Sequence, residues 1–356
     1  MLAIERHAAA LSPASAAALS ILFILIYIVP FYLSPTTRPS LTLNRDAPSV
    51  IQARIRSVGA SCILSSSITV YAITTLGGAS LHDTLHLLGW WPINVTDIAR
   101  CMLLVAVLFA GPLFEAGVVE AQWRDWATLY GLRDTLASWQ GYRNIVVAPL
   151  SEEIIWRSFM IPPHLLAHIP AKTVRTTSPA PPPSLHPTPR RIATRSPFVA
   201  QIVFATPLYF GLAHFHHLYE FRITHPSTPW APAILRSLFQ FTYTSLFGFF
   251  ASFLYLRTGS VWACVLTHAF CNYLGIPRVW GRVGQEVGEA VGEGGLGREG
   301  EGEGPAQEVR EAMRVGDGRL GVEWTVAYYT VLVAGAVGFY YLLWPLTESR
   351  NALVVF

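Results

Sequence analysis

The segment Ser151-Glu152-Glu153-Ile154-Ile155-Trp156-Arg157-Ser158 places two carboxylates and one guanidinium in a stretch that otherwise has the composition of a membrane-buried helix. An ionisable side chain near the centre of a bilayer costs at least about 2.5 to 3.5 kcal/mol, so such residues mark pathways, proton chemistry or structural ion pairs. Glu153 and Arg157 are four residues apart with the acid first, which predicts an ion pair along one helix. Glu152 is turned away from that pair, so its carboxylate needs a partner from another helix. The alternative is that Pro149 starts a helix and both acids merely complement the dipole of its first turn.

The composition is that of a membrane protein. Of 356 residues, 52% are hydrophobic and 13% are charged, whereas soluble domains contain about 25% charged residues. The net charge of +3 is too small to indicate nucleic-acid binding. The four cysteines have no metal-binding or redox spacing and lie in apolar runs, so we interpret Cys62, Cys101, Cys264 and Cys271 as small hydrophobic residues.

Apolar segments recur along the chain and predict an all-α, polytopic membrane protein with a single domain over residues 1–356. The predicted spans are residues 8–33, 58–76, 101–118, 144–166, 198–215, 232–256, 260–275 and 325–346. The spans 232–256 and 260–275 are joined by a very short turn, so we expect antiparallel neighbours. Residues 122–140 combine tryptophans with charges, and we expect them to lie at the membrane interface or to form a re-entrant segment.

Two long connections differ in composition from the rest of the chain. Residues 171–197 contain many prolines and basic residues and no acid, which predicts a flexible, extended loop on the cytoplasmic side. Residues 279–321 are rich in glycine and glutamate and cannot bury enough apolar surface to fold, so we expect disorder there. We expect neither segment to take part in the chemistry.

Further polar groups occur at helical spacing within the predicted spans. Phe210 and His214 are four residues apart, as are His268 and Asn272, so each pair lies on one face of its helix. With Glu152 they could supply a carboxylate that deprotonates water, an imidazole that orients it, and an imidazole with a carboxamide that stabilises an oxyanion. Such a set predicts peptide hydrolysis without a covalent intermediate. The alternative is structural, because an intramembrane histidine often bonds a backbone carbonyl and Asn272 lies near a helix end.

These motifs resemble the signature of the type II CAAX prenyl endopeptidases, the membrane glutamate proteases of the endoplasmic reticulum. The matching blocks are residues 143–153 with Arg157, then Phe210 with His214, then His268 with Asn272, in this order within a core of residues 141–275. The resemblance implies about eight membrane helices that enclose a catalytic cavity open to the cytosol. It also implies a multi-pass protein of the endoplasmic reticulum membrane, in contact with membrane lipids and not with nucleic acid.

The resemblance assigns roles as well. Glu152 would be the base and His214 its helper, and His268 with Asn272 would form the oxyanion site. Glu153, Arg157 and Phe210 would support them. The family removes the C-terminal tripeptide from prenylated CaaX proteins, such as Ras-type GTPases and lipidated pheromone precursors. No cofactor and no metal ion are expected.

Three other functions stay open from the residues alone. A zinc protease could use Glu152, His214 and His268 as ligands, although no His-Glu-x-x-His motif is present. A cysteine protease could use Cys271, three residues from His268, although nothing near it in the sequence would activate the thiol. A non-enzymatic transporter or ion-coupled scaffold could use the same charges as a proton path, although the sequence contains no visible inverted repeat.

Overall fold

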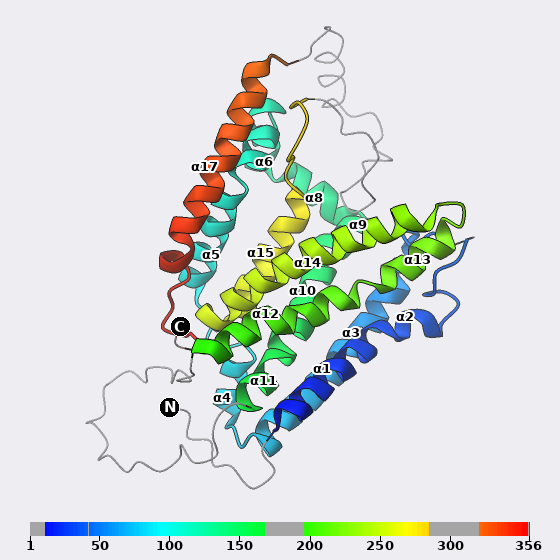
Figure 1. The fold of residues 1–356 in the computed structure, drawn as a ribbon, viewed down its shortest axis with the longest axis vertical. Coiled ribbons are helices and arrows are strands. Elements are labelled where there is room, and N and C mark those ends of the chain that lie inside the picture. The colour runs from blue at the N-terminus through cyan, green and yellow to red at the C-terminus, as the bar shows by residue number, and fades with distance from the viewer. Residues whose placement is uncertain (1–10, 42, 168–195, 285–319, 355) are drawn as a thin grey trace.

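The computed structural model describes residues 11–41, 43–167, 196–284, 320–354 and 356. Within these ranges the chain is all-helical and contains no β-strand, which confirms the predicted class (Figure 1). Most of residues 171–197 and 279–321, for which a flexible loop and disorder are expected, lie outside the described residues.

The first third of the chain supplies helices on both sides of the bundle (Figure 1). Its elements are α1 (Pro13–Ile28), α2 (Pro30–Leu33), α3 (Pro48–Tyr71), the π-helical turn η1 (Ala72–Leu76), α4 (Leu81–Leu87), α5 (Val95–Leu108), α6 (Ala110–Phe114) and the π-helical turn η2 (Glu115–Val119). Three short helices follow, namely α7 (Trp123–Thr128), α8 (Tyr130–Ala137) and α9 (Trp139–Tyr142). Neither α7 nor α8 buries a residue, and each is too short to cross a bilayer. Residues 122–140 therefore do not form a transmembrane helix.

The helix that carries the two acids is irregular. It runs through the π-helical η3 (Arg143–Val147), α10 (Ala148–Glu153), the π-helical η4 (Ile154–Phe159) and α11 (Ile161–Ala167). Pro149 has no N–H to donate within the helix, and the hydrogen-bond pattern changes from π to α at the preceding residue, Ala148. Both acids thus lie at the end of one short α-helical segment between two π-helical ones.

The second half of the chain supplies the longest helices. These are α12 (Ser196–Ala213), α13 (His216–Thr224), α14 (Trp230–Thr258), α15 (Val261–Leu274) and α17 (Val322–Leu346). Gly259 ends α14 in the left-handed conformation with φ +60°, and α15 begins two residues later. The predicted tight hairpin between α14 and α15 is therefore present, and the two helices pack against each other.

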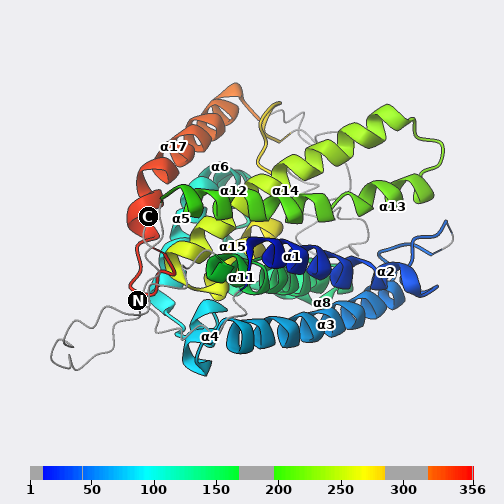
Figure 2. The same cartoon turned by 60° about the horizontal axis from the view of Figure 1, so that its bottom comes forward.

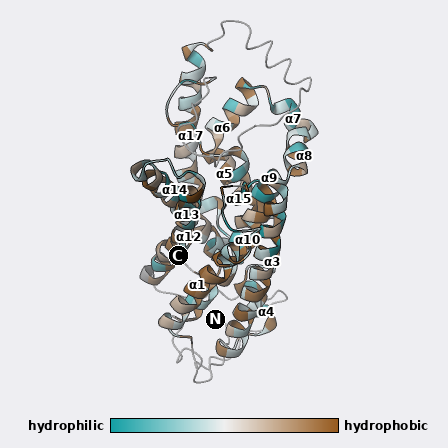
Figure 3. Cartoon of the chain, turned by 90° about the vertical axis from the view of Figure 1, so that its right-hand side faces the viewer, coloured by the Kyte–Doolittle hydropathy of each residue, from teal (hydrophilic) through white to brown (hydrophobic). Residues whose placement is uncertain are grey.

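Four helical stretches of the described residues are long and apolar enough to cross a membrane. They are Pro13–Leu33, Pro48–Leu76, Phe198–Thr224 and Val322–Leu346, and the pair Val95–Leu108 with Ala110–Val119, bent by 78°, would make a fifth span. Along α17 only Tyr328 and Gly335 are buried, and a row of large apolar side chains is exposed, namely Val322, Val326, Val333, Val337, Tyr340, Tyr341 and Trp344. Figure 3 shows that hydrophobic residues make up much of α1. An apolar exterior of this kind suits contact with lipid, so the protein is a membrane protein.

The acid-bearing helix lies in the middle of the bundle. It packs against α15 and α3, while α12 and α14 run antiparallel over one side and α1 with α3 over the other (Figures 1 and 2). Close approach of α12 and α14 depends on glycine, because a Cβ added at Gly248 would stand 2.6 Å from the Cβ of Pro207. Long helices from distant parts of the chain therefore converge on the segment that contains Glu152 and Glu153.

Candidate active site

Glu153 and Arg157 form the ion pair that their spacing predicts. The Nη1 atom of Arg157 donates to Oε1 of Glu153 at 3.0 Å, and both side chains are almost completely buried. The Nη2 atom of Arg157 donates to the carbonyl of Gly248, and its guanidinium lies 5.0 Å from the ring centre of Phe210. This cation is held on three sides, because α14 and α12 both contribute to its cage.

His268 lies between the two acids. Its Nδ1 atom is 2.7 Å from Oε1 of Glu153, and its Nε2 atom is 4.0 Å from Oε2 of Glu152. A carboxylate that is paired with Arg157 can only accept a hydrogen bond, so Nδ1 of His268 carries the hydrogen and donates it. The Glu153–Arg157 pair therefore orients the imidazole and directs Nε2 towards Glu152.

Glu152 is the less constrained of the two acids. Its side chain is 17% exposed and makes no hydrogen bond to any described residue. The nearest ionisable group is His268, at the 4.0 Å separation of an ion pair without direct hydrogen bonding. The sequence predicts that the carboxylate meets a group from another helix, and that group is His268 of α15. His214, the helper that the resemblance implies, makes no hydrogen bond or ion pair with Glu152 in this structure.

His214 lies at the end of α12, where its Nδ1 atom is 2.8 Å from the carbonyl oxygen of Phe210. Because a carbonyl only accepts, Nδ1 donates and Nε2 is left as an acceptor in the neutral ring. The ring packs edge-on against Phe210, with 4.6 Å between centroids. One nitrogen of His214 therefore makes the bond to a backbone carbonyl that the structural alternative predicts. The other nitrogen can still accept a hydrogen bond from water.

Asn272 follows one helical turn after His268 on α15, which ends at Leu274 before Gly275. Its Nδ2 atom donates to the carbonyl of Asn144 at 3.0 Å, within η3. A carboxamide carries two N–H donors, so one of them holds the π-helical backbone and the second is available to a ligand. Asn272 therefore ties α15 to the acid-bearing helix, whatever else it does.

The aromatic and hydroxyl-bearing residues around Glu152 and Glu153 were not identified from the sequence. Tyr27 of α1 lies with its hydroxyl 3.2 Å from that of Ser151 and within electrostatic reach of Glu152. Tyr243 and Phe247 come from α14, and the ring of Phe247 lies 4.5 Å from that of His268. A tyrosine in the middle of an apolar span is a signal that could have identified Tyr27, because its hydroxyl needs a partner inside the bilayer.

The geometry bears on the alternative mechanisms as well. The zinc ligands considered above, Glu152, His214 and His268, do not bring their donor atoms within 4.8 Å of one another; among the described residues the group that does is His216, His217 and Glu220. The four cysteine thiols form no disulfide. Cys271 lies within electrostatic reach of Glu153, whose negative charge disfavours the thiolate that a nucleophile requires.

The chain is similar to known proteins. Residues 134–274 match the family described as type II CAAX prenyl endopeptidase Rce1-like. The chain is 29% identical over 334 residues to a probable CAAX prenyl protease 2 of Schizosaccharomyces pombe, which covers 94% of each chain. It is 31% identical over 249 residues to the human CAAX prenyl protease 2, which covers 67% of this chain and 65% of the human protein. The Saccharomyces cerevisiae CAAX prenyl protease 2 is 26% identical over 270 residues, covering 70% of this chain and 76% of the yeast protein. No solved structure matches. The chain belongs to the Rce1-like type II CAAX prenyl endopeptidases.

Proposed function

We propose that this protein is a membrane endopeptidase that removes the C-terminal tripeptide from prenylated CaaX proteins, with water activated by Glu152 as the nucleophile. Ras-type GTPases and lipidated pheromone precursors are the substrates that we expect. The observation that carries the proposal is the free carboxylate of Glu152 beside an imidazole that the buried Glu153–Arg157 pair orients. A similarity to CAAX prenyl protease 2 over 94% of the chain supports the same reaction.

The proposed reaction needs no covalent intermediate with the protein. Glu152 removes a proton from a water molecule that Nε2 of His214 helps to orient, and the water oxygen attacks the carbonyl carbon after the prenylated cysteine. The carbonyl oxygen becomes negative and accepts hydrogen bonds from the free N–H of Asn272 and from Nε2–H of His268, which must carry a proton on both nitrogens at this step because its Nδ1–H donates to Glu153. The C–N bond then breaks, and Glu152 returns its proton to the departing amine of the tripeptide. Glu153 and Arg157 act through His268, which they hold in position.

The proposal also covers the membrane location, the topology and the partners of the protein. One polytopic domain, with its catalytic core in residues 141–275, would sit in the endoplasmic reticulum membrane with about eight helices around a cavity open to the cytosol. Lipid and prenylated proteins would be its partners, and nucleic acid would not. The basic connection 171–197 supports a cytosolic loop, because lysine and arginine favour that side of the membrane.

The test is the release of a tripeptide from a farnesylated CaaX peptide by the purified protein in detergent or liposomes. Glu152→Gln should lower turnover by at least about 10²-fold to 10⁴-fold, the usual contribution of a general base, while thermal stability is retained because Glu152 has no hydrogen-bonded partner. Glu323→Gln, an exposed acid in the first turn of α17, is the matched control and should be silent. Undiminished turnover by Glu152→Gln would remove the proposed base.

The same assay distinguishes the proposed mechanism from that of a zinc protease. Turnover should survive prolonged treatment with a strong zinc chelator, because Glu152, His214 and His268 lack the mutual geometry of a ligand set. Loss of turnover on chelation, with recovery on adding zinc, would favour a metalloprotease. A protein that binds the peptide and never releases the tripeptide would favour the scaffold alternative.

A further inference from the structure

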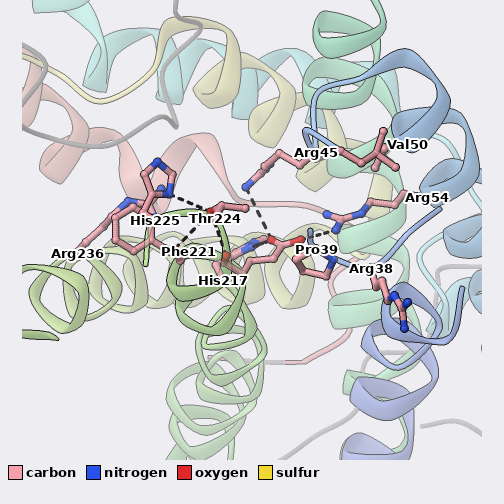
Figure 4. Close-up of a pocket in the computed structure, with 12 residues that line it drawn as sticks. Arg38, Pro39, Arg45, Val50, Arg54, His217, Phe221, Thr224, His225 and Arg236 are labelled. Carbon is pink, nitrogen blue, oxygen red and sulfur yellow. Dashed lines mark hydrogen bonds and ion pairs between the residues drawn. The ribbon is translucent and has the colours of Figure 1, made fainter. Parts of the chain in front are cut away.

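A basic cavity lies where the connection between α2 and α3, the start of α3, α13 and the start of α14 meet, at one end of the bundle (Figures 1 and 4). Its volume is about 30 Å³. Four arginines line it, namely Arg38, Arg45, Arg54 and Arg236, and the lining contains a single carboxylate, Glu220. With the histidines counted as neutral, four guanidinium groups and one carboxylate leave three positive charges around the cavity.

The carboxylate of Glu220 is already bound by neighbouring side chains, because both of its oxygens have partners. Arg54 donates to Oε1, and Nδ1 of His217 lies 2.8 Å from Oε2. The possible ligand atoms of His216, His217 and Glu220 lie close enough together to hold a metal ion. Two guanidinium groups, from Arg45 and Arg54, stand within 4.0 Å of the same carboxylate and oppose a cation there.

Arg45 is the guanidinium that remains available. It is 40% exposed and lies 4.0 Å from Glu220 and 3.9 Å from Asp46, beyond hydrogen-bonding distance from either. Asp46 is bound more closely by Arg143, at 2.6 Å. Across the cavity, the guanidinium of Arg236 stacks 4.6 Å from the ring centre of Phe221, which fixes its direction (Figure 4). The cavity therefore presents fixed cationic donors to a small anion.

The cavity is close to the catalytic centre. His217, in its wall, has its ring 5.8 Å from that of His214. On α14, Tyr243 lies within electrostatic reach of Glu152 on one side and of Arg45 and Arg236 on the other. Arg236 precedes Tyr243 by seven residues, which correspond to about 10 Å along a helix.

We infer that this basic cavity binds the C-terminal carboxylate of the substrate peptide and thereby sets the cleavage point three residues from the chain end. The inference rests on the proposed function. Three residues of extended peptide reach about 10 Å, and the wall of the cavity at His217 lies within that reach of His214, with 5.8 Å between the two ring centres. Guanidinium donors suit both a carboxylate and a phosphate, and the closeness of the cavity to His214 favours the carboxylate of a bound substrate peptide.

The experiment compares three farnesylated peptides that differ only at the C-terminus: the free acid, its C-terminal amide and an acid that is one residue longer. The wild-type protein should show a KM for the amide about 10-fold to 100-fold above that for the acid, as expected for loss of charge-assisted hydrogen bonds. The longer acid should be cleaved after its prenylated cysteine at least about 10-fold less efficiently, because its carboxylate is displaced by about 3.3 Å. Any cleavage that does occur at another bond should again release three residues.

Arg45→Gln and Arg236→Gln should raise KM for the free acid by a similar factor, leave kcat within about twofold and leave the amide unaffected. Arg56→Gln is the matched control, because Arg56 is exposed on α3 two residues after Arg54 and does not line the cavity. Thermal unfolding of each variant checks that it is folded.

Other outcomes would overturn the inference. Equal KM values of the wild-type protein for acid and amide would show that the carboxylate is not recognised. Equal losses for both peptides in Arg45→Gln, dependent on the fraction of anionic lipid in the liposomes, would assign the cavity to a lipid headgroup. Failure of the wild-type protein to cleave either peptide would instead count against the proposed function.

Discussion

At the scale of single residues, Glu153 is the acid whose replacement should destabilise the fold. Oε1 of Glu153 is shared by Arg157, at 3.0 Å, and by Nδ1 of His268, at 2.7 Å, and the side chain has no exposed surface. Removing one member of a buried ion pair typically costs about 3 to 5 kcal/mol, because the other charge stays buried without a counter-charge.

Glu153→Gln should therefore lower the yield of monodisperse protein and its thermal unfolding temperature in detergent. Turnover should fall as well, because the carboxylate that accepts from His268 becomes a neutral amide, which orients the imidazole less strongly. Glu323→Gln provides the control of equal charge change at an exposed position. A Glu153→Gln protein with unchanged thermal stability and no turnover would mean that Glu153 takes part in the chemistry directly.

Asn272 is expected to have two duties, because one N–H holds the carbonyl of Asn144 and the other can face the oxyanion. Asn272→Ala should reduce kcat by about 10²-fold to 10³-fold with little change in peptide affinity, since the second contact strengthens mainly in the transition state. Single-turnover kinetics and a peptide-binding titration separate the two effects. A change in stability alone, with normal kcat in the folded fraction, would leave Asn272 with a structural duty only.

At the scale of the helices, the contact between α12 and α14 decides whether the arginine cage forms. Gly248 contributes the carbonyl that accepts from Nη2 of Arg157, and it lets Pro207 of α12 approach. A Cβ at this position would stand 2.6 Å from that of Pro207 and 3.4 Å from Nη2 of Arg157. Overpacking of this kind typically costs about 1 to 3 kcal/mol.

Gly248→Ala should accordingly lower the unfolding temperature and reduce turnover together, because it shifts the helices around Arg157. Gly59→Ala is its matched partner, since Gly59 lies in α3 with no atom within 4 Å of an added Cβ. That change should be neutral or stabilising by up to about 1 kcal/mol, the helix propensity difference between glycine and alanine. Equal responses of the two variants in thermal unfolding would contradict the proposed role of close packing at Gly248.

At the scale of the whole molecule, the chain leaves and re-enters the bundle at one place around residues 285–319. The backbone N–H of Val283 donates to the side chain of Thr325, and a Cβ on Gly284 would stand 2.6 Å from Leu320. Arg278, just upstream, pairs with Glu115 at 3.0 Å and accepts from Tyr328 through its carbonyl. The flanks of the segment are thus anchored independently of it.

Replacing residues 285–319 with a short glycine-serine linker should leave both thermal stability and tripeptide release close to wild type, because the two ends already meet. The deletion must stop at Gly284, since residues 278–283 hold α17. A well-folded, inactive short-linker protein would show that the segment has a duty in catalysis or substrate capture.

The sequence alone determined the properties that depend on composition and on local spacing. The low content of charged residues identified an all-α membrane protein, and a four-residue interval predicted the ion pair of Glu153 with Arg157. The tight turn at Gly259 predicted neighbouring antiparallel helices from local spacing as well.

Only the tertiary structure decided which groups from different helices meet. Periodicity places His214, His268 and Asn272 on helix faces, but it carries no information on helix rotation or on the distance between helices. Packing brings His268 rather than His214 beside Glu152, ties Asn272 to Asn144 and gathers arginines from two distant segments around one cavity. The physical reason is that each of these contacts joins segments far apart in the chain, and ridges and glycine gaps of the packed helices set the separations.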